Sequence, residues 1–203
     1  MKSISTLLGI VLLAISLNAC DDNNPQSNTL SVAEPTEREN AILATTADRS
    51  FVFDFSIDSE YKEASVWIEK YEAGTLADDQ INKLTAPVAK SGSIIFATSK
   101  TNDNQKQLLF NIGVTSNGST GSAIGFDENS TVLDSMSSVW GSFQGEITPT
   151  EGEAVLASIC YSDNDDDANM SSLTSEFYNN ADGHLSELEE YDVVYLIKTE
   201  FVK

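Results

Sequence analysis

The sequence predicts a mainly β protein, an antiparallel β-sandwich with one or two short helices. Apolar residues alternate with period two, most clearly at 51–57, where Phe51, Phe53 and Phe55 fall on one side of an extended chain. Turn-forming residues separate such segments at intervals of roughly 10 to 20 residues, which is typical of sandwiches. The chain has 203 residues, 40% of them hydrophobic, enough for one domain with a core.

The strands expected from this pattern are, in order, 51–57, 64–71, 93–98, 107–115, 121–127, 137–148, 153–161 and 191–201. Asn117 and Gly118 lie between two of them and predict a tight hairpin. Segment 137–148 contains glycines and is expected to be a strand pair or a bulged strand. The spacing fits an immunoglobulin-like architecture. Because the Cys…Trp…Cys spacing of antibody domains is absent from the sequence, such a likeness would be architectural only.

Two stretches are expected to be helical. Segment 75–84 begins with the N-cap residue Thr75 and carries spaced apolar residues. Segment 172–179 places Leu173 and Phe177 four positions apart, so that both fall on one helix face.

The N-terminus has the pattern of an export signal. Lys2 precedes an apolar run at 4–17 that is too short to span a bilayer, and the run ends in Leu-Asn-Ala-Cys at 17–20. These last four residues resemble the lipobox of bacterial lipoproteins, with Asn18 as a mild departure. The resemblance covers residues 1–20 only. It implies removal of residues 1–19, lipid attachment to Cys20, and anchoring to the cell membrane on its extracytoplasmic side. An ordinary signal peptide cut after Ala19 is the alternative.

The segment after Cys20 is polar and rich in amides, with few large apolar side chains. Such a composition cannot bury surface, so residues 20–48 are expected to be the lipidated cysteine and a flexible tether. A single β-sandwich domain is then expected at 49–203.

The charge of the chain excludes one class of function. There are 32 acidic and 11 basic residues, for a formal net charge of −21. Without a basic stripe to displace counterions from phosphates, nucleic acid binding is not expected. Acidity of this size favours solubility and attracts divalent cations.

The densest acidic run suggests a calcium loop. Asp163, Asp165, Asp167 and Asn169 occupy alternate positions, and hard cations prefer oxygen ligands of this kind. The match to an EF-hand fails at Ala168, where the sharp turn needs glycine, and at the twelfth position, where a glutamate is needed. The alternatives are therefore a looser calcium site in a sandwich loop and a plain solvated loop.

Aromatic residues suggest a binding surface. Trp67 and Tyr71 share one side of the strand 64–71 with Glu69 between them, and Trp140 lies in a later strand. Exposed aromatics on a sandwich can stack on sugars or anchor a protein. The alternative is that these rings belong to the core.

Three functions follow from these observations. The favoured hypothesis is a membrane-anchored, non-catalytic domain that binds an envelope protein or glycan. A calcium-dependent binding module is the first alternative, and a hydrolase of envelope polymers is the second. No catalytic constellation is recognisable: the single histidine, His184, lies in a turn, and Cys160 lies in an apolar stretch that predicts a buried, inert thiol.

Overall fold

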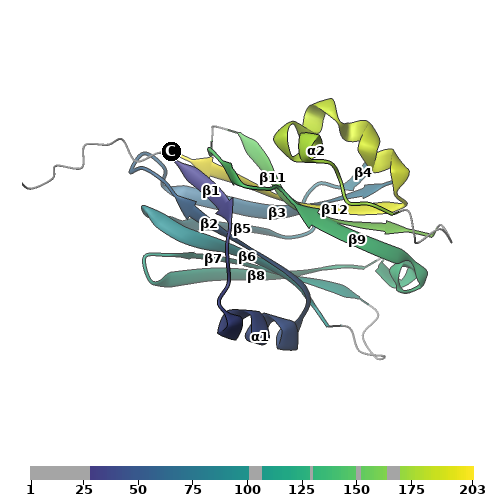
Figure 1. Ribbon diagram of the computed structural model, residues 1–203, viewed down its shortest axis with the longest axis horizontal. Helices are drawn as coiled ribbons and strands as arrows, with labels where there is room; N and C mark the ends of the chain where they lie inside the picture. Colours follow the sequence, from purple (N-terminus) through teal and green to yellow (C-terminus); the bar gives the residue numbers. More distant parts are fainter. Residues whose placement is uncertain (1–27, 101–106, 129, 150–151, 164–169) are drawn as a thin grey trace, which may run out of the picture.

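The computed structural model of this chain describes residues 28–100, 107–128, 130–149, 152–163 and 170–203. It confirms the predicted fold class: two six-stranded antiparallel sheets pack face to face as a sandwich (Figure 1). Sheet A has the strand order β10-β1-β2-β6-β7-β8. Sheet B has the order β4-β3-β12-β11-β9, with β5 also paired to β3.

The strands of sheet A are β1 (Thr29–Val32), β2 (Ala47–Ser56), β6 (Ser91–Ser99), β7 (Leu108–Ser116), β8 (Ser119–Asp127) and β10 (Glu146–Ile147). Those of sheet B are β3 (Glu63–Glu72), β4 (Thr75–Asp78), β5 (Lys83–Pro87), β9 (Ser137–Ser142), β11 (Glu153–Ser162) and β12 (Val193–Val202). The helices are α1 (Glu37–Thr46) and α2 (Ser175–Asn179), with 3-10 turns η2 (Ser130–Ser135), η4 (Ala181–Gly183) and η5 (Leu185–Glu190).

Aromatic side chains fill the space between the sheets. Phe110 of β7 packs against Tyr195 of β12 with ring centroids 5.0 Å apart, and Phe55 of β2 meets Phe201 of β12 edge-on at 5.3 Å. All four rings are buried. Each such ring removes about 150–250 Å² of surface from water, so the aromatic layer supplies much of the energy that holds the two sheets together.

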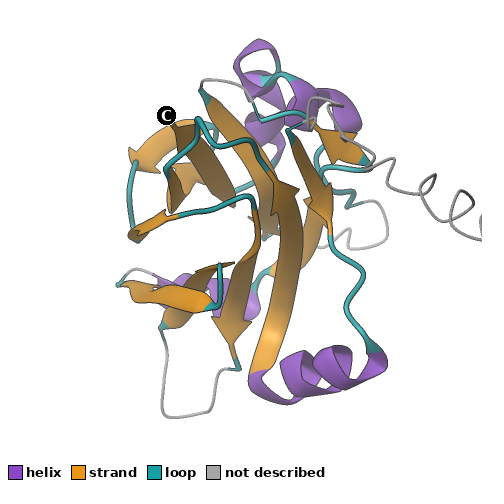
Figure 2. Ribbon diagram, turned by 90° about the vertical axis from the view of Figure 1, so that its left-hand side faces the viewer, coloured by secondary structure: helices purple, strands orange, loops and turns teal. Residues whose placement is uncertain are grey.

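Helix α1 and the segment from α2 to η5 lie outside the strand layers, on opposite sides of the sandwich (Figure 2). Helix α1 lies beside sheet A, and the segment from α2 to η5 lies over sheet B. The buried residues of this second segment are Phe177, Tyr178 and Leu188. Both faces of sheet B are therefore covered over much of their area.

The boundary between tether and domain was predicted wrongly. Residues 29–48, expected to be part of a flexible tether, form β1, α1 and the start of β2. Strand β1 pairs with both β2 and β10, and Leu30 is 1% exposed. A reciprocal capping box between Thr36 and Glu39 starts α1.

Two other segments also differ from expectation. Segment 75–84 is not a helix: it forms β4 and the start of β5, and both strands pair with β3. An Asx turn, in which the Gln80 N–H donates to Asp78, reverses the chain between them. Segment 137–148 divides between the sheets, because the buried Phe143 and the left-handed Gly145 (φ +78°) carry the chain from β9 in sheet B to β10 in sheet A.

A buried ion pair joins the sheets near one end. Lys70 Nζ of β3 lies 2.8 Å from Asp127 Oδ2 of β8, and the Tyr195 hydroxyl donates to the same oxygen at 2.6 Å. Burial lowers the pKa of Lys70, but hydrogen bonds and attraction from Asp127 and Glu72 outweigh burial and leave it raised. Burial and the Asp127 carboxylate raise the pKa of Tyr195, so its hydroxyl stays protonated and donates.

We expect Asp127→Asn to lower the free energy of unfolding by about 3 kcal/mol, because it leaves the buried Lys70 ammonium without its carboxylate in the other sheet. Urea unfolding measures the change. The neighbouring Glu128→Gln, at an exposed position, should shift stability by less than about 0.5 kcal/mol. Equal effects of the two substitutions would show that the ion pair does not stabilise the sandwich.

Candidate functional site

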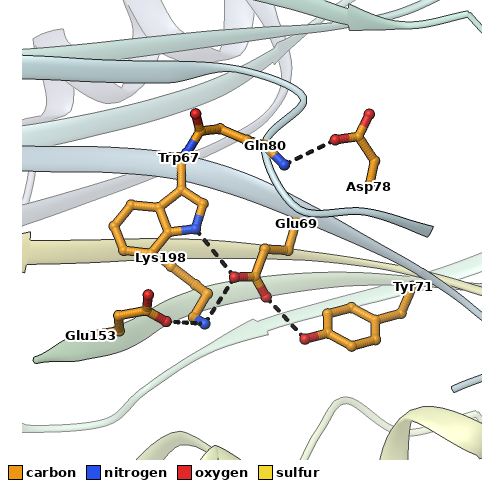
Figure 3. A network of polar contacts seen from close by, with 7 residues as sticks. All are labelled: Trp67, Glu69, Tyr71, Asp78, Gln80, Glu153 and Lys198. Carbon is orange, nitrogen blue, oxygen red and sulfur yellow. Dashed lines mark hydrogen bonds and ion pairs between the residues drawn. The ribbon is translucent and has the colours of Figure 1, made fainter. Parts of the chain in front are cut away.

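A hydrogen-bonded network occupies the outer face of β3, the face that points away from sheet A (Figure 3). Its centre is Glu69, which is 7% exposed. Trp67 Nε1 donates to Glu69 Oε1 at 3.2 Å, and the Tyr71 hydroxyl donates to Glu69 Oε2 at 2.9 Å. The three residues are two positions apart along one strand, so the alternation of a β-strand places them on the same side.

Lys198 of β12 completes the network. Its Nζ donates to Glu69 Oε1 at 2.9 Å and to Glu153 Oε2 at 2.5 Å (Figure 3). Burial lowers the pKa of Lys198, but the hydrogen bonds and charges of Glu153 and Glu69 outweigh it and the pKa is raised. The network thus holds one ammonium between two carboxylates, of which Glu69 is buried and Glu153 is exposed.

A pocket of about 450 Å³ opens beside Lys198, between the helical segment and sheet B. Its lining combines an ammonium, carboxylates, amides and two hydroxyls with a few apolar groups: Ile147, Thr148, Glu153, Ala154, Val155, Tyr178, Asn179, Asn180, Ala181, Asp182 and Lys198. The side chains of Asn179, Asn180 and Asp182 are exposed. The pocket is therefore rich in hydrogen-bond donors and acceptors.

A family profile described as the YgaN domain matches residues 29–201. The chain belongs to the YgaN domain family. The matched range begins at β1 and ends in β12, so it coincides with the observed sandwich rather than with the expected start at residue 49. No curated protein and no solved structure shows significant similarity to the chain.

The YgaN domain brings together only part of the predicted aromatic surface. Trp67 and Tyr71 meet at Glu69, but the Trp67 ring is 4% exposed. Lys83 and Lys198 lie 5.3 and 5.7 Å from its ring centroid. Trp67 therefore acts as a buried support of the network, and its ring offers no open stacking surface.

Trp140 lies elsewhere. In the register of sheet B it aligns with Ile159, Tyr195 and Lys70, and these point toward sheet A, away from the face of Trp67. It is 50% exposed on β9, and the Arg49 guanidinium lies over its ring at 4.2 Å. The prediction of one surface from Trp67, Tyr71 and Trp140 is therefore wrong for Trp140.

The predicted calcium ligands lie mostly beyond the described residues. Asp165, Asp167 and Asn169 are among residues that the structure does not describe, and Asp163 donates its N–H to Asp192 Oδ2 at 2.8 Å. Within the described ranges, no group of three or more His, Cys, Asp or Glu side chains is arranged to hold a metal ion. Calcium binding at 163–169 stays a prediction.

Of the two cysteines, Cys160 is among the described residues and Cys20 is not. Cys20 lies outside the described residues, so its lipidation also stays a prediction. Cys160 is fully buried on β11, and burial raises the pKa of its thiol to about 12. A thiol of this kind is a poor nucleophile at neutral pH, as its apolar sequence context predicts. No helix among the described residues is both long and apolar enough to cross a membrane.

Sequence reasoning missed Lys198 and the pocket. A lone lysine within the apolar run of β12 was a usable signal, because lysine is rarely buried unless it is paired. Its partners could not be identified from sequence, since Glu69 and Glu153 lie on two other strands.

We expect Lys198→Met to destabilise the YgaN domain by about 2–3 kcal/mol at neutral pH, because it removes the opposite charge and its hydrogen bond from the buried Glu69 carboxylate. The folded-state pKa of Lys198 is raised above its usual 10.5, so its contribution is complete below that pH. It is lost as the pH rises through the folded-state value.

The measurement is urea unfolding of both proteins between pH 7 and pH 11.5. The stability gap should narrow only above about pH 10.5. Lys83→Met is the matched control: Lys83 also faces the Trp67 ring, but it is exposed, and its loss should cost less than about 1 kcal/mol. A gap that is constant over the whole range would contradict the role given to the Lys198 charge.

Proposed function

We propose that this YgaN domain protein is a lipid-anchored, extracytoplasmic binding protein whose pocket beside Lys198 takes a polar, hydroxyl-rich ligand such as an envelope glycan. The observation that carries the proposal is the pocket itself. Its volume of about 450 Å³ lies within the range of roughly 300–1,000 Å³ that is usual for small-ligand sites.

The lining favours this class of ligand over an apolar one. Sugar hydroxyls both donate and accept, and the pocket offers both kinds of partner in the amides of Asn179 and Asn180, the carboxylates of Glu153 and Asp182, and the ammonium of Lys198. The network behind Lys198 fixes this side chain through Glu69. A site whose polar groups are already oriented binds with a smaller entropic cost.

The same geometry favours binding over hydrolysis of the ligand. A glycoside hydrolase needs two carboxyl groups beside the scissile bond, one of which donates a proton. Here Glu69 and Glu153 both accept hydrogen bonds from the Lys198 ammonium. Both Glu69 oxygens also accept hydrogen bonds from Trp67 and Tyr71, so this carboxylate is held within the protein and is not presented to a substrate.

The start of the domain limits how far it can lie from a membrane to which Cys20 is anchored. Strand β1 begins at Thr29, nine positions after Cys20. An extended chain advances about 3.4 Å per residue, so a lipidated Cys20 would keep the start of β1 within about 30 Å of the membrane. The Asn28 amide donates a hydrogen bond to Asp58, and Lys203 pairs with Glu60, so Asn28 and Lys203 lie at the same end of the sandwich. An anchor at Cys20 would hold this end toward the membrane.

Binding of oligosaccharides of N-acetylglucosamine and of glucose to the full chain in detergent, measured by calorimetry, tests the pocket. We expect Asn180→Ala and Glu153→Ala each to lower the affinity for the sugar about tenfold. Each removes a group whose hydrogen bond contributes about 1.4 kcal/mol to binding. Glu176→Gln is the control: it is exposed on α2 next to the pocket but does not line it. Equal losses with all three variants, or no binding of either sugar series, would refute the proposed ligand class.

Membrane fractionation tests the anchor. We expect the protein to partition with membranes and Cys20→Ser to release it in soluble form, because a thioether-linked lipid cannot form on serine. Cys160→Ser is the control, because Cys160 is buried and should not change partitioning. Membrane retention of the Cys20→Ser variant would show that lipid on this cysteine is not the anchor.

A further inference from the structure

Strand β8 forms an open edge of sheet A. Within the described residues it pairs only with β7, in continuous register from Leu108↔Asp127 to Ser116↔Ser119. Its nine residues make it longer than the other sheet edges, β10, β4 and β9. It contains no lysine, proline or bulge, the usual features that prevent an edge from pairing with another strand, and its one charged residue is Asp127 at its end.

The hairpin turn fixes which backbone groups face outward. Asn117 and Gly118 both have positive φ, so β7 and β8 are joined by a two-residue turn. The residues that flank such a turn form a hydrogen-bonded pair, and bonded pairs then alternate along the ladder. The N–H and C=O groups of Thr120, Ser122, Ile124 and Phe126 are therefore expected to point away from β7.

The far half of this edge borders a pocket of about 440 Å³. Its lining includes Ile124 and Phe126, which are 71% and 46% exposed, and the acidic residues Asp78, Asp127 and Glu128. Exposed apolar side chains beside an unpaired strand edge offer an added strand both backbone hydrogen bonds and apolar contact. Because Asp127 is paired with Lys70, the exposed Asp78 and Glu128 are the acids that give this end of the edge its negative charge.

We propose that β8 binds an extended segment of a partner protein, one that carries alternating apolar and basic residues and joins sheet A as a further strand. Charge complementarity selects this occupant. The exposed Asp78 and Glu128 favour a cationic segment, whereas a second copy of β8 contains no basic residue to place against them. The net charge of −21 also opposes self-association. The β8 edge is on the other sheet from the Lys198 pocket, so this binding does not depend on the proposed glycan site.

The probe is a labelled nine-residue peptide of alternating valine and lysine, blocked at both ends, titrated against the full chain in detergent by fluorescence anisotropy. A peptide with glutamate for lysine tests the charge. A valine–lysine peptide N-methylated at alternate residues tests the backbone hydrogen bonds. We expect the first peptide to bind at least tenfold more tightly than either of the others.

Substitutions in the protein distinguish strand addition from nonspecific electrostatic attraction. Ser122→Pro removes an outward N–H without breaking the β7 ladder, so the variant should fold and lose at least tenfold in affinity. Ser122→Ala keeps the N–H and should bind normally. Glu128→Lys should weaken binding more than Glu34→Lys, which changes the net charge equally at an exposed site next to α1.

Equal binding of the N-methylated peptide, or equal effects of Glu128→Lys and Glu34→Lys, would overturn the proposal. So would unaltered affinity in a folded Ser122→Pro protein. Sedimentation of the free protein completes the test: a concentration-dependent dimer that Ser122→Pro abolishes would assign the edge to a second copy of the chain instead.

Discussion

The three central strands of sheet B are buried on both faces, and this constraint determines where their polar residues lie. Strands β3, β11 and β12 are buried along most of their length, on one face by sheet A and on the other by the segment from α2 to η5. A polar side chain on such a strand needs a partner, because an unpaired buried group costs about 1–3 kcal/mol. The network around Glu69 satisfies this requirement with donors from its own strand and from β12.

Strand β3 carries two such networks on opposite faces. Glu69 points outward to Lys198, and the next residue, Lys70, points inward to Asp127 of sheet A. In each network, a charged side chain of β3 forms an ion pair with an oppositely charged side chain of another strand. The first orients the ammonium that lines the polar pocket, and the second connects the two sheets near the open edge of β8. The position of β3 therefore links the proposed glycan site to the proposed strand-binding edge.

Period-two alternation was sufficient to predict the sandwich, because one face of each of the strands β2, β6 and β7 is apolar, as with Phe53 and Phe55. It failed at 75–84, where pairing with β3 overrides the local helical spacing, and Leu76 is 48% exposed. The start of the domain was missed although Thr36 and Glu39 form a capping-box signature. Pocket residues could not be grouped from sequence, because β10, β11, α2 and β12 meet only through the tertiary fold.

The pairing of lysines inside the fold leaves the negative charge of the chain to its other residues. Lys70 and Lys198 are each matched by a buried carboxylate, of Asp127 and Glu69, so these pairs cancel and the rest of the chain carries the formal net charge of −21. A partner approaching the domain therefore meets a strongly negative field, which accelerates encounters with cations and slows those with another copy of the chain. This field does not act on the net charge of a neutral sugar, which is zero, whereas it attracts a basic strand. The two proposed sites should consequently differ in salt dependence, since only binding at the β8 edge depends on long-range attraction.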